Sequence, residues 1–152
     1  MSVETIVLAA DGEDEDIADR LAATAADIAD RSNTEIILAH VFDDDEYESA
    51  HDQLNFTDDR EVTPSLIAER KVAIRDLSDA LADSDADITA HGRLSNGASH
   101  GQRLVELADE VDADMVVLGG RGRSPAGKAL FGSTAQEVML ESSCPVTFVR
   151  AA

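Results

Sequence analysis

Residues 114–134 have the sequence DMVVLGGRGRSPAGKALFGST, and the fold class is best predicted from this part of the chain. Its first part, residues 114–120, is an apolar run with the length of a buried strand, and it ends in two glycines. A helix is predicted from about residue 133 to 142, directly after Gly132. A buried strand that leads through a glycine-rich loop into a helix is typical of a parallel α/β sheet.

Four further apolar runs extend this pattern over the rest of the chain. They predict strands at residues 3–10, 34–42, 87–94 and 145–150. Except for the mixed run at 87–94 the strands are nearly all apolar, and every strand but the last is followed by a helix, so the sequence predicts a single doubly wound α/β domain over residues 1–152. The remaining helices are predicted around residues 17–28, 64–81 and 104–111.

Residues 43–61 are rich in Asp and Glu and separate the second strand from the next helix. They are the part of the chain that most resembles a long loop. A solvated acidic loop is expected there, and a lid over a binding site is the alternative.

The charge of the chain limits its partners. Its 32 acidic and 12 basic residues give a formal net charge of −20, which argues against binding to nucleic acid or to an anionic membrane. Only two of the basic residues are lysines, Lys71 and Lys128. Because salt screens the repulsion between carboxylates, we hypothesise that the protein is adapted to a high-salt cytoplasm.

The chain has neither a basic leader followed by an apolar run nor an apolar stretch that approaches 18 residues. We therefore expect a soluble protein of the cytoplasm. Cys144 is the single cysteine, which excludes an intramolecular disulfide, and we expect it to be a small buried residue before Pro145.

Two phosphate-binding patterns overlap in the glycine-rich stretch. Gly122, Gly127 and Lys128 make most of a P-loop, but Ala129 stands where a P-loop needs a hydroxyl group to bind Mg²⁺. A dinucleotide fingerprint fits less well, because Pro125 takes the place of its third glycine.

The second pattern is Gly119-x-x-Gly122-x9-Gly132-Ser133, and it fits the predicted elements better. Its first glycines lie where a strand ends, and Gly132-Ser133 lies where the next helix begins. Glycine allows a backbone to approach a phosphate closely, and a helix N-terminus offers free N–H groups, to which Ser133 and Thr134 add hydroxyls. The alternative is an ordinary loop with Ser133 as the helix N-cap.

The distribution of charge favours the phosphate interpretation. Residues 13–16 are four carboxylates at the start of the first predicted helix, where they would repel a phosphate. Arg121, Arg123 and Lys128, by contrast, are the densest basic cluster of the chain. Phosphates are therefore expected at Gly132 and not at the first helix.

With these motifs the sequence resembles the universal stress proteins of the ATP-binding branch. The resemblance extends over nearly the whole chain, from Asp11-Gly12 at the end of the first strand to the closing CPVTFVR at residues 144–150. It also includes LAHV at 38–41 and VVLGGRGRS at 116–124.

The resemblance implies a five-stranded parallel sheet of order 3-2-1-4-5 with helices on both faces. It implies that ATP, or ADP or AMP, is held at the carboxyl ends of strands 1 and 4, with Mg²⁺ or Mn²⁺ able to bridge the phosphates. Adenine and ribose would meet Ala10, Asp11 and the backbone of Val41. The remaining cofactor-binding residues would be Leu118, Gly119, Arg121, Gly122, Gly132, Ser133 and Thr134.

The resemblance further implies a nucleotide-binding regulatory protein of the stress response, a homodimer that pairs through its last strand. Two alternatives stay open: a slow ATPase or phosphotransferase that uses Lys128 and Asp11, and an interaction module with a vestigial pocket. No general base is evident, so we expect binding and not rapid catalysis. The histidines at 40, 51, 91 and 100 have no metal-site spacing, and His40 is expected to be packed or capping.

Overall fold

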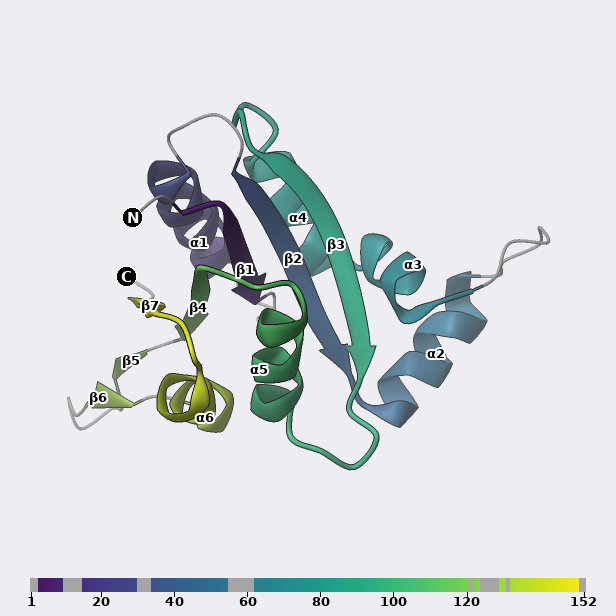
Figure 1. Cartoon of the computed structure of the whole chain (residues 1–152). Helices are drawn as coiled ribbons and strands as arrows, with labels where there is room; N and C mark the ends of the chain where they lie inside the picture. The colour runs from purple at the N-terminus through teal and green to yellow at the C-terminus, as the bar shows by residue number, and fades with distance from the viewer. Residues whose placement is uncertain are drawn as a thin grey trace.

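The computed structural model describes residues 3–9, 15–29, 34–54, 62–120, 122–123, 129–130 and 132–150. Its centre is a five-stranded sheet of order β3-β2-β1-β4-β7 in which all neighbouring strands are parallel (Figure 1). Counted along the chain, this is the expected order 3-2-1-4-5. The strands are β1 (Thr5–Ala9), β2 (Glu35–Phe42), β3 (Asp87–Leu94), β4 (Met115–Gly120) and β7 (Val146–Arg150).

Helices cover both faces of the sheet, as predicted. On one face, α1 (Glu15–Ile28) and α4 (Val72–Ala80) enclose a buried cluster that contains Ile6 and Leu8 of β1. On the other, α5 (His100–Glu110) and α6 (Ser133–Glu141) enclose a cluster that contains Val7 and Ala9. Successive side chains of a strand point to opposite faces, so a strand with helices on both sides must be apolar at every position.

The acidic stretch at residues 43–61 is not simply a loop, which corrects the prediction. Residues Asp44–Leu54 form helix α2, and residues 55–61 lie outside the described part. Three carboxylates occupy its first turn, where the helix dipole favours them. Tyr47 and Ala50 pack against buried Phe42 and Ile67, and this small third core holds the helix in place.

The single helix expected over residues 64–81 is two helices, α3 (Pro64–Glu69) and α4. The Thr63 hydroxyl caps α3 by accepting a hydrogen bond from the Leu66 N–H at 3.1 Å. A Cβ atom on Gly92 of β3 would lie 2.2 Å from the Pro64 carbonyl oxygen, and the Ser65 hydroxyl accepts the Gly92 N–H at 3.1 Å. The chain breaks between the two helices because α3 lies over the outer edge of β3 while α4 covers a sheet face.

The glycine-rich stretch contains two short antiparallel strands that the sequence did not predict. They are β5 (Gly122–Arg123) and β6 (Ala129–Leu130), in which Gly122 is opposite Leu130. This hairpin lies between the end of β4 and the start of α6.

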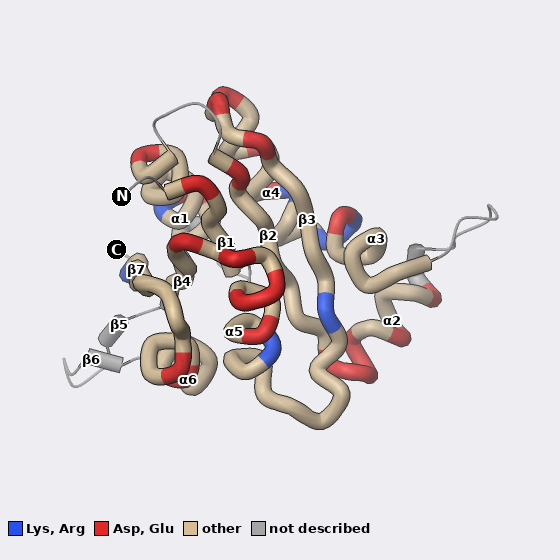
Figure 2. Tube along the Cα trace, viewed as in Figure 1, with Lys and Arg blue, Asp and Glu red and all other residues tan. Residues whose placement is uncertain are grey.

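Acidic positions are distributed along the whole tube in Figure 2, whereas basic positions are few. Cys144 is half-buried, not fully buried as expected, and its N–H donates to the Ser142 hydroxyl at 3.2 Å. Among the residues described, none of the helices is long and apolar enough to cross a membrane.

Candidate functional site

The sheet reverses its direction of winding between β1 and β4. From β1 the chain proceeds outward to β2 and β3, and it then returns past β1 to form β4 and β7. Leu8 of β1 pairs with Val117 of β4, so the two strands on either side of the reversal are direct neighbours. In open α/β sheets ligands bind outside the carboxyl ends of the strands at such a point. Of the residues expected there, Ala10, Asp11 and Arg121 lie outside the described part of the chain.

The structure places Val41 and Leu118 on the two strands that flank β1. Both belong to the buried cluster under α5 and α6, which also contains Ala9 at the end of β1 and Ala135 in the first turn of α6. Their side chains are 5% and 4% exposed. These buried residues therefore form a floor below the carboxyl edge of the sheet.

Gly119 faces the opposite side of the sheet from Leu118. A Cβ atom there would lie 2.9 Å from the Val149 carbonyl oxygen and 3.0 Å from Cγ1 of Ile17 on α1. These distances are shorter than ordinary van der Waals contacts. The absence of a side chain at Gly119 lets α1 pack directly against β4 and β7, which is a structural role independent of any ligand.

Helix α6 begins without a side-chain cap. Its N-cap is Gly132, with φ −57° and ψ 160°, and Ser133 is its first helical residue, so the alternative that Ser133 is the N-cap is wrong. At α3 and α5 the hydroxyls of Thr63 and Ser99 accept a hydrogen bond from the first turn. Gly132 provides no such acceptor for the first turn of α6, and that turn contains no acidic residue.

Neither the backbone nor the described neighbours explain why residue 132 is a glycine. Its φ is accessible to any residue. A Cβ atom at Gly132 would have no atom of the described residues within 4 Å, and the residue is exposed. Among the described residues, nothing fills the space that a side chain at position 132 would occupy.

Contacts that the sequence did not reveal hold α5 and α6 together. The Ser99 hydroxyl donates a hydrogen bond to Oε1 of Glu137, and a Cβ atom on Gly101 would lie 2.6 Å from the same oxygen. The N-termini of both helices consequently lie at the same edge of the sheet. A glycine inside an amphipathic helix was the available signal, because it often marks close packing.

Two histidines make contacts at the end of β2. Nε2 of His100, the first residue of α5, lies 2.8 Å from Oδ1 of Asp43, and this pair was also not predicted. His40 is 7% exposed, its Nε2 lies 2.8 Å from Oε1 of Glu46, and its ring packs edge-on against Phe42 at 4.4 Å. The prediction that His40 is a packed residue is confirmed. Within the described ranges, no group of three or more His, Cys, Asp or Glu side chains is placed to hold a metal ion.

Comparison with known proteins places this geometry in a family. The model of the universal stress protein family matches residues 2–150. A universal stress protein of Thermus aquaticus, from the QAH/OAS sulfhydrylase 3′ region, is 30% identical over 149 residues, which cover 97% of this chain and 98% of that protein. The chain also matches about half the length of two other curated stress proteins.

Solved structures agree with this match. The universal stress protein of Archaeoglobus fulgidus has a TM-score of 0.67 and 27% identity, over 96% of this chain and 98% of that one. A universal stress protein solved in complex with cAMP has a TM-score of 0.63 and 25% identity, over 100% of both chains. The sequence match over nearly the whole chain and the shared sheet order lead to one conclusion: this chain belongs to the universal stress protein family.

Proposed function

We propose that this protein binds an adenine nucleotide, ATP foremost, at the carboxyl ends of β1 and β4, and that nucleotide occupancy controls its contact with a partner in the stress response. The observation that carries the proposal is the start of α6 after β4, where the N-cap is Gly132 and no described residue fills the space that a side chain there would occupy.

Phosphate groups suit this place for three physical reasons. The N-cap Gly132 has no side chain to accept the first-turn N–H groups, and the helix dipole adds a partial positive charge. Ser133 and Thr134 add hydroxyl donors in the same turn. Gly132 allows an anion to approach the backbone, and Gly122 and Arg121 from the preceding hairpin region complete the proposed phosphate site.

The base and ribose would lie above the floor formed by Val41 and Leu118. Ala10 and Asp11 follow β1 directly and would reach the ribose, while the Val41 backbone would meet the adenine. The protein solved with cAMP supports an adenine nucleotide as the class of ligand. Mg²⁺ or Mn²⁺ would bridge phosphate oxygens and reduce their repulsion from an acidic protein.

The proposal also includes a homodimer that pairs through β7. Among the described residues β7 pairs only with β4, so its other edge is available for a second strand. Leu140 on the neighbouring helix α6 is 79% exposed, and a partner subunit would cover it. Sedimentation in molar salt at micromolar concentration is expected to show a dimer, and a monomer alone would contradict this part of the proposal.

The test of nucleotide binding combines two measurements. Mass spectrometry of natively purified protein is expected to find a copurified adenine nucleotide, and calorimetry with ATP and Mg²⁺ is expected to show saturable binding. Gly132→Val fills the open space and should abolish the heat of binding. Thr63→Ala removes a helix cap at the far edge of the sheet and serves as the control that should leave affinity unchanged. Equal affinity of Gly132→Val and the unmodified chain would remove the proposed phosphate site.

A further inference from the structure

A cleft lies beside the carboxyl end of β3, away from the reversal of the sheet. It is enclosed by the start of α3, the end of β3 and one side of α5, and it has a volume of about 430 Å³. That size falls within the range of small-molecule sites. Its lining includes Pro64, Leu94, Arg93, Arg103, Glu106 and Glu110.

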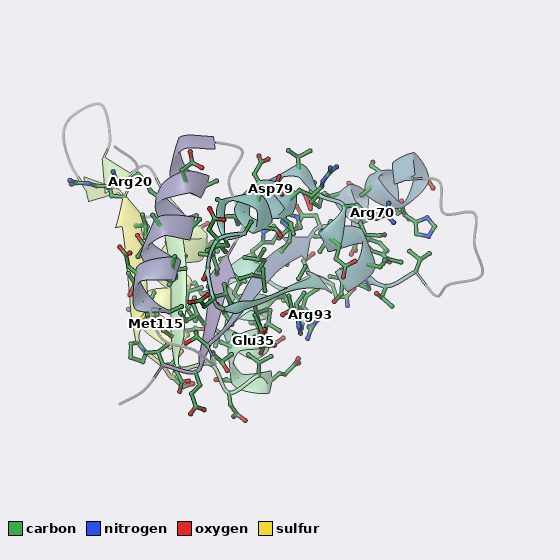
Figure 3. The ribbon with its side chains drawn as sticks, turned by 90° about the horizontal axis from the view of Figure 1, so that it is seen from above. Arg20, Glu35, Arg70, Asp79, Arg93 and Met115 are labelled. Atoms are coloured by element: carbon green, nitrogen blue, oxygen red, sulfur yellow. The ribbon has the colours of Figure 1, made fainter. Side chains whose placement is uncertain are left out.

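Two arginines from different elements line this cleft. Nη1 of Arg93 donates to the Gly92 carbonyl at 2.9 Å, and Nε of Arg103 donates to the Ser95 carbonyl, also at 2.9 Å. Main-chain oxygens at the end of β3 therefore fix both guanidinium groups. Figure 3 shows Arg93 on the side of the sheet away from Asp79 of α4.

Each arginine is also paired with one glutamate of α5. Nη2 of Arg93 lies 2.9 Å from Oε2 of Glu110, and Nη1 of Arg103 lies 2.6 Å from Oε2 of Glu106. A guanidinium has five N–H donors, so each arginine keeps donors beyond these contacts. The glutamate side chains are 59% and 44% exposed, and such exposed pairs contribute little to stability, so an incoming anion can displace them at small cost.

From this arrangement we propose that the cleft binds a small organic anion with a carboxylate or phosphate group, held between the guanidinium groups of Arg93 and Arg103. Planar guanidinium groups in fixed positions match the oxygens of both anions. Pro64 and Leu94 provide an apolar surface for the body of the ligand. The proposal does not depend on the nucleotide site, because no lining residue of this cleft belongs to that site.

His91 provides a spectroscopic reporter of the cleft. It lies two residues before Arg93 on β3, and burial together with the charge of Arg93 lowers its pKa below the ordinary value of 6.5, against the opposing effect of Glu35 and Glu110. An anion on Arg93 would offset part of that positive charge. Binding should therefore raise the pKa of His91.

The experiment titrates the whole chain with succinate and, separately, with inorganic phosphate at constant ionic strength, followed by NMR of the His91 ring and the arginine Nε–H groups. The Gly132→Val variant is used throughout, so that phosphate at the proposed nucleotide site does not contribute. Saturable shifts with either probe are expected, and the probe that binds identifies the preferred anion.

Four substitutions on that background decide the outcome. Arg93→Gln and Arg103→Gln should each weaken binding at least about tenfold. Glu110→Gln should strengthen it about threefold, because a competing carboxylate is gone. Arg75→Gln, an exposed arginine of α4 on the other face, should have no effect. Failure of both probes to saturate the cleft, even with Glu110→Gln, would overturn the proposal, as would binding that survives Arg93→Gln.

Discussion

Ser99, at the start of α5, contacts Glu137 in the middle of α6, although a strand and a glycine-rich loop separate the two helices in the sequence. The Ser99 hydroxyl caps α5 by accepting the Gln102 N–H at 3.2 Å, and it also donates to Glu137 of α6. One hydroxyl group therefore both begins α5 and fixes the position of α6 beside it.

Loss of this hydroxyl should destabilise the protein more than loss of an ordinary helix cap. Ser99→Ala removes the cap and the contact with Glu137 together, and we expect unfolding free energy to fall by about 1 to 2 kcal/mol. Urea unfolding in concentrated salt measures this. Glu137→Gln keeps an acceptor for the hydroxyl and is the control, and an equal loss in both variants would contradict the assigned role.

Replacement of Gly101 by alanine tests the contact between α5 and α6, because the contact predicts that stability falls where helix propensity alone predicts that it rises. Alanine is normally favoured over glycine inside a helix by about 1 kcal/mol. Gly101→Ala should nevertheless destabilise the protein, because the new Cβ would lie 2.6 Å from Oε1 and 2.9 Å from Cβ of Glu137. Shortening the neighbour in the double variant Gly101→Ala, Glu137→Ala should recover part of the loss. Thermal unfolding of the three variants tests the contact, and a stabilised single variant would show that α6 moves freely.

The two outer glycines of the phosphate motif should respond differently to valine. Gly119→Val would force apart α1, β4 and β7, and we expect it to destabilise the fold by about 2 kcal/mol or more whether or not nucleotide is present. Gly132→Val enters open space and should cost at most about 1 kcal/mol as a poorer N-cap, while nucleotide binding is lost. Denaturation and calorimetry on both proteins separate the two roles. Similar stabilities would contradict the assignment of Gly119 to packing.

His91 should make the protein less stable in mild acid. Burial, and next the charge of Arg93, lower its pKa below 6.5, so between the folded pKa and 6.5 the unfolded chain binds more protons than the folded one. The contribution of His91 to the free energy of unfolding is constant above about pH 6.5. It is lost as the pH falls from there through the pKa of the folded state. The free energy of unfolding should decrease less between pH 7.5 and pH 5.5 in His91→Gln than in the unmodified chain. An NMR titration of the His91 ring with a midpoint at or above 6.5 would contradict this.

Salt should stabilise the protein strongly. The chain of 152 residues has a net charge of −20, so its carboxylates repel one another in the folded state. In molar salt the Debye screening length falls to about 3 Å, which removes most of this repulsion. We expect the melting temperature to rise steadily between 0.1 and 2 M KCl. Sucrose at matched osmolarity controls for preferential exclusion, which acts on any protein. A melting temperature independent of KCl would remove the hypothesis of adaptation to a salty cytoplasm.

The sequence predicted the elements whose pattern is local. The runs at 34–42 and 114–120 are nearly all apolar because helices cover both sides of β2 and β4. Such runs can be recognised from the local sequence alone. The strand order was available through the family resemblance carried by the glycine spacing. The family resemblance also predicts Val41 and Leu118 as site residues; the structure places both in the buried core below the sheet edge, and their contact with a ligand stays a prediction.

The rest depends on contacts between distant segments. Composition predicted a loop at 43–61, but Tyr47 meets Phe42 and Ile67 only after β2 and α3 are in place, and these contacts support α2. The break between α3 and α4 lies at Arg70 and Lys71 and accompanies the packing of α3, through Pro64, against Gly92 of β3. The pair of Asp43 and His100 joins residues 57 positions apart, and neither residue carries a local sign of its partner.

The placement of α3 against β3 has a consequence for behaviour in concentrated brine. In such a solution salt screens most of the long-range repulsion between acidic molecules. Steric cover of exposed strand edges then becomes more important for keeping the molecules apart. The Ser65 hydroxyl accepts the hydrogen bond of the Gly92 N–H, so this group is not available to another strand. The Pro64 backbone lies against the same part of β3 and blocks the approach of a second chain. This part of the sheet edge is thus covered by atoms whose steric effect does not depend on salt. Pairing of a second copy with it is hindered even when charge repulsion between the molecules is screened.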